Sequence, residues 1–173
     1  MAKTVRVGII GAGNIAASAH VPGYRAAQDV EIVAVCDIVP GRADAFAAEH
    51  DIPHAYASHQ EMLAKVPLDA VSVCTPNFVH KETTIDALEA GLHVLCEKPI
   101  AMNLAEGQAM EAAARKAGNV LQIGLHWRFT AEAQVLKRFA EAGDLGDIYY
   151  GEATYLRRRG IPGWGVFTQK ALQ

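Results

Sequence analysis

The sequence predicts an α/β protein in which helices cover both faces of an open, doubly wound parallel sheet. Short, almost wholly apolar runs alternate with longer segments of helical character, and turns rich in glycine, proline or asparagine separate them. Strands that are apolar along their whole length are typical of parallel sheets buried on both faces. The chain has 173 residues, of which 51% are hydrophobic, so it can form one domain with a substantial core and part of a second.

Five apolar runs are predicted as strands, and a weaker sixth lies between the second and the third. They are Val5–Ile10, Glu31–Cys36, Ala70–Cys74, His93–Cys96 and Val120–Gly124, with the weaker one at Ala55–Ala57. Because helical segments separate most of these runs, the strands are expected to join through right-handed crossovers.

Four segments between the strands are predicted as helices: Asn14–Ala27, Pro40–Glu49, Asn77–Ala90 and Asn103–Ala117. Pro22 lies inside the first helix and is expected to interrupt or kink it. Asn77 and Asn103 suit the N-cap, where a side-chain oxygen accepts a hydrogen bond from a free backbone N–H. Gly91 and Gly118 follow two of the helices and suit a left-handed cap.

The character of the sequence changes after the last of these strands. A helix is predicted at Ala131–Ala142, an alternating strand at Ile148–Arg157 and a turn at Gly160–Gly165. One helix and one long strand cannot form a core by themselves, because the strand needs partners. We therefore predict one domain over residues 1–125 and the truncated start of an α+β domain over residues 126–173.

Charge and hydropathy exclude several classes of partner. The net charge of −3 and the pI of about 6.1 argue against nucleic acid. The basic run Arg157-Arg158-Arg159 is interpreted as a solvated strand end, with contact to an anionic substrate or a cofactor phosphate as the alternative. No stretch approaches the roughly 18 apolar residues of a membrane helix, so no membrane partner is expected.

The cysteines and histidines give no metal signature. Cys36, Cys74 and Cys96 each end an apolar run without metal or redox spacing, so they are expected to stay reduced in a cytoplasmic protein. Three histidines lie near Pro53, which prevents them from sharing one helical face. No metal site is predicted.

The first strand runs directly into the segment GAGNIA at residues 11–16. Gly11 allows a tight turn, Gly13 lets the backbone approach a pyrophosphate, and Ala16 takes the place of a third glycine. The phosphates would lie at the N-terminus of the following helix, where free N–H groups and the helix dipole favour negative charge. Such a segment alone is a weak signal, because glycine-rich turns also serve as plain connections.

An acidic residue strengthens this prediction of a Rossmann-type dinucleotide site. Asp37 ends the second strand about 20 residues after the glycine segment, where a carboxylate would hold a ribose 2′-hydroxyl. A polar cap on the next turn is the alternative role for Asp37. Its charge repels the 2′-phosphate of NADP, so NAD is favoured, but the nearby Arg42 keeps NADP possible.

Two further polar segments follow the strands at residues 70–74 and 93–96. In open parallel sheets, ligands bind outside the carboxyl ends of the strands. The first segment is Thr75-Pro76-Asn77 with His80, and the second is Glu97-Lys98-Pro99. The simpler interpretation of the first is a strand stop and a helix start, with His80 at the surface.

Lys98 is the candidate for chemistry. Oxidation of a secondary alcohol removes a hydride from carbon and a proton from the hydroxyl. A lysine can take that proton when burial or a cationic neighbour, such as the nicotinamide of NAD⁺, weakens its hold on its own proton. Pro99 restricts the backbone of Lys98, which helps to fix the direction of its side chain. The alternative is an ordinary surface lysine.

The combination of GAGNIA, Asp37, TPN with His80, EKP and the later Gly124 resembles the family of glucose–fructose oxidoreductase, inositol dehydrogenase and rhizopine-catabolism proteins (Gfo/Idh/MocA). The resemblance covers essentially the whole chain, and EKP is its most specific element. It implies NAD or NADP bound in an N-terminal Rossmann domain, and a sugar, cyclitol or related polyol as substrate. It also implies that a second domain binds substrate and commonly forms a homo-oligomer interface.

The resemblance assigns roles to single residues. The pyrophosphate would be lined by Gly11, Gly13, Asn14 and Ile15, and the adenosine ribose would be bound by Asp37. The path toward the nicotinamide would be lined by Thr75, Asn77 and His80, and the nicotinamide ribose would be bound by Glu97. Lys98 would be the catalytic lysine, Arg128 would bind near the cofactor at the active site, and Trp164 would match a tryptophan that reaches the cofactor. An aspartate and a histidine that share proton transfer with the lysine are expected beyond Gln173, so this chain alone is expected to bind cofactor with little or no turnover.

Two alternatives to an NAD(P)-dependent oxidoreductase stay open. One is a non-catalytic dinucleotide-binding sensor or regulatory module, for which Lys98 has no chemical use. The other is a hydratase- or lyase-like variant that keeps its cofactor bound and cycles it internally.

Overall fold

The computed structural model describes residues 3–156 and residue 158. Up to Gly124 the chain forms one parallel sheet of six strands in the order β3-β2-β1-β4-β5-β6. The strands are β1 (Val5–Ile10), β2 (Val30–Cys36), β3 (His54–Tyr56), β4 (Ala70–Val73), β5 (His93–Cys96) and β6 (Leu121–Ile123). The predicted strands of this part are confirmed to within one residue at each end, as is the doubly wound α/β fold.

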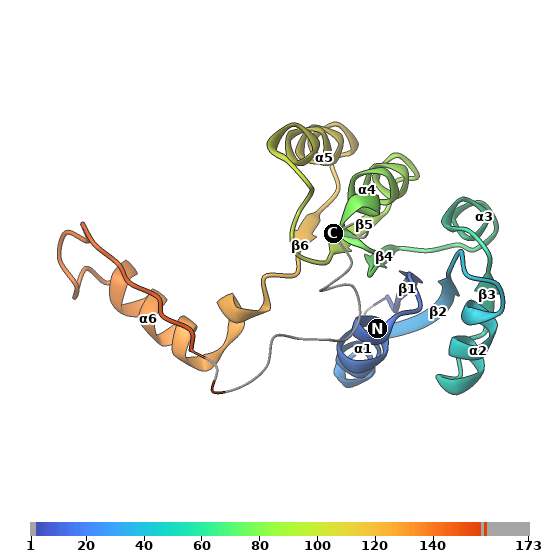
Figure 1. Ribbon diagram of the computed structural model, residues 1–173, viewed down its shortest axis with the longest axis horizontal. Coiled ribbons are helices and arrows are strands. Elements are labelled where there is room, and N and C mark those ends of the chain that lie inside the picture. Colours follow the sequence, from blue (N-terminus) through green and yellow to red (C-terminus); the bar gives the residue numbers. More distant parts are fainter. Residues whose placement is uncertain (1–2, 157, 159–173) are drawn as a thin grey trace. The chain divides into compact units, whose positions relative to one another are not determined.

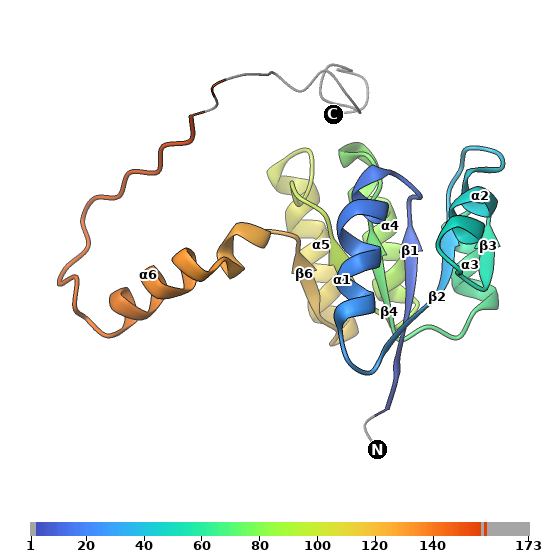
Figure 2. The same ribbon diagram turned by 90° about the horizontal axis from the view of Figure 1, so that it is seen from below.

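Helices connect these strands and form a layer on each face of the sheet. They are α1 (Val21–Ala26), α2 (Arg42–Glu49), α3 (His59–Lys65), α4 (His80–Glu89) and α5 (Leu104–Ala117). In Figure 1, α3, α4 and α5 lie above the sheet and α1 and α2 lie below it, and Figure 2 shows the same layers from below. Each layer buries its own apolar cluster against the strands.

The direction of winding reverses between β1 and β4. The chain passes from β1 outward to β2 and β3, and it then returns to place β4 on the other side of β1. The two adjacent strands therefore send their following loops apart, one toward each helix layer. A crevice at such a reversal is where open α/β sheets bind ligands.

The first predicted helix is interrupted, as expected from Pro22. A π-helical turn, η1 (Ala16–His20), precedes α1, and the N–H of Val21 donates to the carbonyl of Ala16 across it. Pro22 falls in the first turn of α1, directly after this π turn.

The predicted caps are partly confirmed. The side chain of Asn103 accepts a hydrogen bond from the N–H of Glu106 at 3.0 Å, and Gly118 ends α5 with φ +69°. The prediction of Asn77 as an N-cap is wrong. A 3₁₀ turn, η2 (Asn77–Val79), leads into α4, and neither element has a side-chain cap.

The helix α3 was not among the predicted elements. Ser58 caps this helix by accepting a hydrogen bond from the N–H of Glu61 at 3.2 Å. Serine followed three residues later by glutamate is the pattern of a capping box, which could have revealed the helix.

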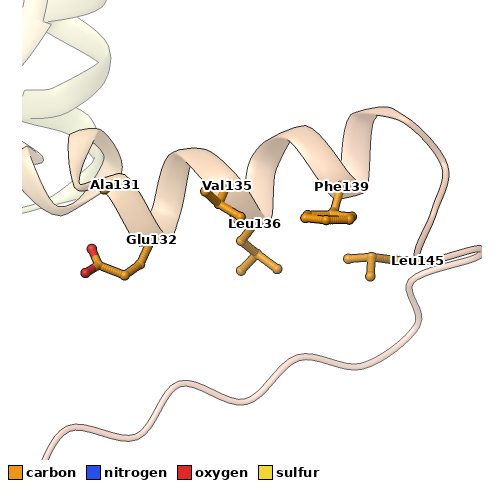
Figure 3. A pocket seen from close by; sticks show the side chains of 6 residues that line it. All are labelled: Ala131, Glu132, Val135, Leu136, Phe139 and Leu145. Carbon is orange, nitrogen blue, oxygen red and sulfur yellow. The ribbon is translucent and has the colours of Figure 1, made fainter.

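The chain divides into two compact units between Gly124 and Leu125. In the second unit, a 3₁₀ turn, η3 (His126–Phe129), precedes α6 (Ala131–Glu141), which confirms the predicted helix. Figure 3 shows side chains of Val135, Leu136 and Phe139 along α6, with Leu145 beyond its end.

The strand predicted at Ile148–Arg157 is wrong for residues 148–156, which form no strand. A strand is stable only when a neighbour accepts and donates its backbone hydrogen bonds, and the described part of the second unit contains no strand to pair with it. Arg157, Arg159, the predicted turn at Gly160–Gly165 and Trp164 lie outside the described residues. Within residues 3–156 and residue 158, no helix is long and apolar enough to cross a membrane.

Candidate functional site

Four backbone hydrogen bonds between neighbouring strands align the loops at the carboxyl edge of the sheet. The N–H that follows each of four strands donates to the last residue of a neighbouring strand. The pairs are Gly11 with Cys36 at 2.8 Å, Cys74 with Ile10 at 2.7 Å, Glu97 with Val73 at 3.0 Å, and Gly124 with Cys96 at 2.8 Å. The glycine segment, the TPN segment, the EKP segment and Gly124 therefore lie at one edge.

The two glycines of the first loop differ in what surrounds them. Gly11 has φ +99°, and a Cβ added there would lie 2.8 Å from the carbonyl oxygen of Cys74. A Cβ at Gly13 would meet no atom within 4 Å. Open space therefore lies beside Gly13 at the start of a helix, where the first N–H groups have no intrahelical partner. This cradle fits the pyrophosphate of a dinucleotide.

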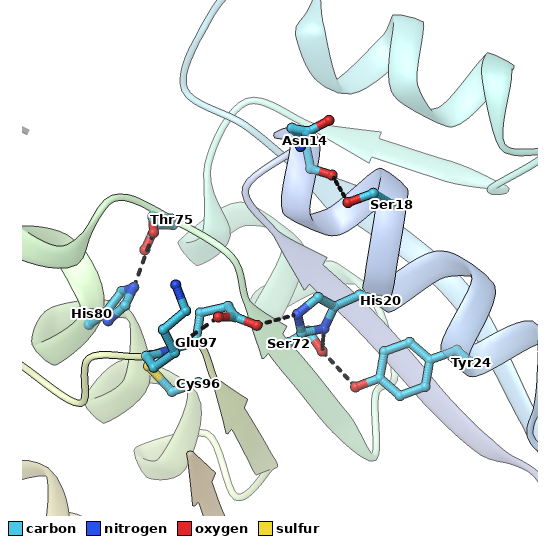
Figure 4. A network of polar contacts seen from close by, with 10 residues as sticks. Asn14, Ser18, His20, Tyr24, Ser72, Thr75, His80, Cys96 and Glu97 are labelled. Atoms are coloured by element: carbon cyan, nitrogen blue, oxygen red, sulfur yellow. Dashed lines mark hydrogen bonds and ion pairs between the residues drawn. The ribbon is translucent and has the colours of Figure 1, made fainter. Parts of the chain in front are cut away.

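Asn14 and Ile15 are exposed at the beginning of the same helix. Ser18 folds back over the helix and donates to the carbonyl of Asn14 at 2.7 Å (Figure 4). Neither Asn14 nor Ile15 is needed for the core, so both are free to face a ligand at this helix end.

Asp37 ties the end of β2 to the glycine loop. Its Oδ2 accepts a hydrogen bond from the N–H of Ala12 at 2.9 Å, and its Oδ1 accepts one from the N–H of Val39 at 2.8 Å. Nη1 of Arg42 lies 3.6 Å from Oδ2. Asp37 therefore caps the next turn, as the alternative interpretation held, while its charge stands beside the cradle.

Replacing Asp37 by asparagine should shift the cofactor preference toward NADP⁺. The amide removes the charge that repels a 2′-phosphate, and it releases Arg42 to pair with that phosphate. We expect the ratio of NADP⁺ to NAD⁺ affinity, measured by calorimetry, to rise at least about tenfold, or ~1.4 kcal/mol. Arg42→Ala added to this variant should cancel the gain, and an unchanged ratio in Asp37→Asn contradicts the role of the charge.

Thr75 offers an unused polar atom at the carboxyl end of β4. Its Oγ1 is buried and has no hydrogen-bond partner. A buried hydroxyl without a partner is costly, so a partner from a ligand would satisfy it. Asn77, two residues on, is half-buried in the first turn of η2.

His80 was expected to lie along the cofactor, but the structure places it in the interior. The ring is fully buried, with Nδ1 2.8 Å from the carbonyl oxygen of Pro99 and Nε2 3.0 Å from that of Thr75. Figure 4 shows the ring turned toward Thr75. His80 therefore lies beneath the TPN and EKP segments and links them, rather than facing a ligand.

Replacing His80 by alanine should lower the free energy of unfolding by about 2–4 kcal/mol, because it opens a cavity and removes the ring that contacts both loop carbonyls. Thermal unfolding would report this loss. NAD⁺ affinity should fall as well, since the two loops lose their common support. Leu88→Ala, a fully buried change further along α4, is the control: it should destabilise without changing affinity. Equal affinity in both variants contradicts the linking role.

Glu97 and Lys98 begin the EKP segment at the end of β5. The carboxylate of Glu97 is mostly buried, whereas Lys98 is exposed and its peptide bond to Pro99 is cis. The N–H of Lys98 donates to Oε2 of Glu97 at 3.2 Å. Nε2 of His20 lies 3.1 Å from Oε1 of Glu97, as Figure 4 shows. No pattern in the sequence predicts this contact of His20, because Glu97 lies 77 residues away.

The charge state of Glu97 is set by opposing influences. Burial raises the pKa of Glu97, but the hydrogen bond from His20 lowers it, aided by the backbone N–H and charge of Lys98. The net result is a pKa below the ordinary value. Glu97 is therefore an anion at neutral pH, able to accept hydrogen bonds from hydroxyl groups.

Arg128 lies in η3 of the second unit and is exposed. The structure thus brings most of the predicted cofactor-binding side chains to one edge of the sheet but leaves Arg128 in a separate unit. Among the described residues, no group of three or more histidine, cysteine, aspartate or glutamate side chains could hold a metal ion.

The profile described as "Oxidoreductase family, NAD-binding Rossmann fold" matches residues 5–125. The chain belongs to the Gfo/Idh/MocA family. The match confirms the resemblance that the sequence suggested, the Rossmann fold and NAD as the cofactor class.

Individual members of the family resemble the chain closely. D-glucoside 3-dehydrogenase of Escherichia coli (strain K12) is 47% identical over 169 residues, which are 98% of this chain and 48% of that protein. The scyllo-inositol 2-dehydrogenase (NADP(+)) IolU of Bacillus subtilis (strain 168) is 39% identical over 111 residues, 64% of this chain and 34% of that protein. The chain thus spans about half or less of the length of these Gfo/Idh/MocA relatives.

Solved structures of the family support the same conclusion. The WlbA dehydrogenase from Chromobacterium violaceum, in complex with NADH and UDP-GlcNAcA, has a TM-score of 0.79 and 33% identity, covering 86% of this chain and 43% of that one. NADH is thus bound by a structural neighbour, and NADP⁺ is named for one relative, so both forms of the cofactor occur among proteins similar to this one.

Proposed function

We propose that this chain is the cofactor-binding part of an NAD(P)-dependent dehydrogenase that transfers hydride between a nicotinamide cofactor and a sugar, cyclitol or related polyol. The observation that carries the proposal is the bond between His20 and Glu97. It joins the helix after the glycine cradle to the EKP segment, and the exposed Lys98 lies at the same edge of the sheet as the cradle.

Each part of the cofactor has a matching group on the sheet edge. The pyrophosphate would be held by Gly11, Gly13, Asn14 and Ile15, and the adenosine ribose by Asp37. The path toward the nicotinamide would be lined by Thr75 and Asn77, and the nicotinamide ribose would be held by Glu97. The nicotinamide, when bound, supplies the acceptor or donor of hydride. NAD is preferred in this proposal because the carboxylate of Asp37 borders the cradle.

Lys98 would exchange a proton with the substrate hydroxyl. Its side chain is exposed at the carboxyl edge of the sheet, so a substrate oxygen can approach its Nζ. The lysine accepts the proton as the alcohol is oxidised and returns it in the reverse direction. Arg128 would contribute from the second unit, which we propose as the start of a substrate-binding domain that also forms the contact between subunits of a homo-oligomer.

The names of the relatives support the substrate class. One relative is a D-glucoside 3-dehydrogenase and another is a scyllo-inositol 2-dehydrogenase, and both names denote oxidation of a secondary alcohol on a ring with several hydroxyls. We infer a ring polyol for this chain as well.

The first test is calorimetric titration of the chain with NAD⁺ and NADP⁺, with circular dichroism of the same sample to verify folding. We expect NAD⁺ to bind more tightly. A folded chain that binds neither dinucleotide contradicts the proposed function.

A chimera tests turnover. Residues 1–173 would be joined to the remaining length of the E. coli D-glucoside 3-dehydrogenase, and NADH formation would be followed by absorbance with a D-glucoside as substrate. Turnover supports the dehydrogenase. Binding of NAD⁺ without turnover in a folded chimera favours the non-catalytic sensor instead.

A further inference from the structure

A chain of four polar side chains crosses the layer between α1 and the sheet. Tyr24 Oη lies 2.6 Å from Oγ of Ser72, which lies 3.0 Å from Nδ1 of His20. On the other side of the ring, Nε2 lies 3.1 Å from Oε1 of Glu97. Figure 4 shows these side chains in one line from α1, across β4, to the end of β5.

The fold itself does not require this chain of contacts. Ser72 is fully buried and His20 is 8% exposed, in a layer whose other members are mostly aliphatic. Burying polar groups is unfavourable unless each finds a partner, and apolar side chains of similar size would fill the layer at least as well. A role in the candidate cofactor site explains why polar side chains occupy this layer between α1 and the sheet.

The hydrogen bonds have a consistent direction. A neutral imidazole donates from one nitrogen and accepts at the other. Glu97, as a carboxylate, only accepts, so Nε2 carries the hydrogen. Nδ1 then accepts from the hydroxyl of Ser72, and Ser72 in turn accepts from the hydroxyl of Tyr24. Every group in the chain is satisfied in this order, and Ser72 and Tyr24 support the tautomer of His20 that Glu97 selects.

The π turn positions His20 in this chain. A π turn contains one residue more than an α turn, and the extra residue rotates the rest of the helix by about 100° around its axis. His20 ends the turn, and Tyr24 lies four residues later on the same face, so both reach Ser72. Single π turns are frequent at functional sites.

Two hydrogen bonds hold the carboxylate of Glu97, and the lack of a side chain at Gly124 leaves room for it. His20 contacts Oε1, the N–H of Lys98 donates to Oε2, and a Cβ on Gly124 would lie 3.1 Å from Oε1. Other titratable groups nearby carry no competing charge: burial raises the pKa of Cys74 and raises that of Cys96 to about 11, so both thiols are neutral. His20 and Lys98 are thus the groups that determine the state of this carboxylate.

We propose that His20 is a positioning residue, which keeps the carboxylate of Glu97 ionised and oriented for the ribose hydroxyls at the nicotinamide end of the cofactor. This inference rests on the proposed function, because it takes that ribose as the partner of Glu97. Ser72 and Tyr24 act on the cofactor only through His20.

The test compares NAD⁺ affinity in the wild-type chain and in His20→Phe, which fills the same space without a donor, from about pH 8 to about pH 5. Without His20, burial dominates and Glu97 takes up a proton at higher pH than before. The ratio of wild-type to variant affinity should therefore grow at least about tenfold as the pH falls across this range. His20→Gln, which keeps an N–H donor, should restore most of the affinity at low pH.

A purely structural role would give a different result. A constant ratio across the pH range, or no loss of affinity in His20→Phe, overturns the proposal. Thermal unfolding of each variant verifies that it is folded at every pH used. Ser72→Ala should give a smaller loss of the same pH dependence, because His20 keeps its bond to Glu97 but loses the hydroxyl that supports its tautomer.

Nuclear magnetic resonance separates this inference from the proposed function. The ¹⁵N shifts of His20 in the free chain should show the hydrogen on Nε2, and Ser72→Ala should let the other tautomer appear. If the wild-type chain binds no dinucleotide, the proposed function fails, and with it the role of His20, whatever the tautomer. If it binds but the hydrogen lies on Nδ1, the proposed function stands and the positioning role of His20 is overturned.

Discussion

Replacing Lys98 by methionine should reduce hydride transfer by about 10²- to 10⁴-fold, while NAD⁺ affinity changes little. Methionine keeps an unbranched side chain of similar length but cannot exchange a proton with the substrate hydroxyl. Glu97 retains both of its oxygen contacts, since one comes from His20 and the other from the backbone of residue 98. Turnover would be measured in the chimera with the E. coli relative, and affinity by calorimetry in the chain itself.

Lys116→Met provides the matched control, because Lys116 is also exposed but lies in the last turn of α5, away from the carboxyl edge of the sheet. Its turnover should equal that of the wild type. Lys98→Arg should stay slow, because arginine keeps the positive charge but does not release its proton. A fast Lys98→Arg variant would show that Lys98 contributes charge alone, and a fast Lys98→Met variant would remove it from the mechanism.

The strands and most helix ends could be predicted from the sequence because their causes are local. A continuous apolar run predicts a strand buried on both faces, and Asn103 with Glu106 predicts a helix start within four residues. The helix α3 has a signal just as local, in Ser58 and Glu61, but the helix is too short to show a clear helical periodicity. The strand expected near Tyr149 depended on a partner strand, which local patterns do not supply.

The site could be predicted only in part, for the same physical reason. Glycine spacing and the EKP segment predict which loops would face a ligand, because their chemistry lies within a few residues. The residues that support these loops from below, in contrast, are far from them in the sequence. His20 and Glu97 are 77 positions apart in the sequence, and His80 and Pro99 are 19 apart, so only the fold brings each pair together. The sequence shows the two histidines but does not show which residues they contact.

Asp37 shows that two interpretations of one residue need not exclude each other. The sequence offered a turn cap or a ribose-binding carboxylate. The hydrogen bonds from Ala12 and Val39 establish the cap, and they also fix the charge beside the cradle. A rigidly held carboxylate discriminates between cofactors better than a mobile one, since it cannot turn away from a 2′-phosphate.

The other large effect is expected at Gly11, where alanine should lower the free energy of unfolding by about 2–5 kcal/mol. The backbone there has φ +99°, which costs an L residue roughly 1–2 kcal/mol, and the new Cβ would lie 2.8 Å from the carbonyl oxygen of Cys74. That oxygen belongs to the backbone at the end of β4, so β1 and β4 must separate to make room. In a domain of this size the melting temperature should fall by roughly 5–15 °C.

Gly13→Ala is the natural comparison, because the same methyl group enters open space and its φ lies outside the left-handed region. Its melting temperature should stay close to that of the wild type, yet NAD⁺ affinity should fall, since the methyl group occupies the place of the pyrophosphate. The two glycines of one motif would then separate into a glycine that the fold requires and a glycine that the ligand requires. Equal melting temperatures for Gly11→Ala and the wild type would contradict the close approach of β1 and β4, whereas unchanged affinity in a stable Gly13→Ala variant would place the pyrophosphate elsewhere.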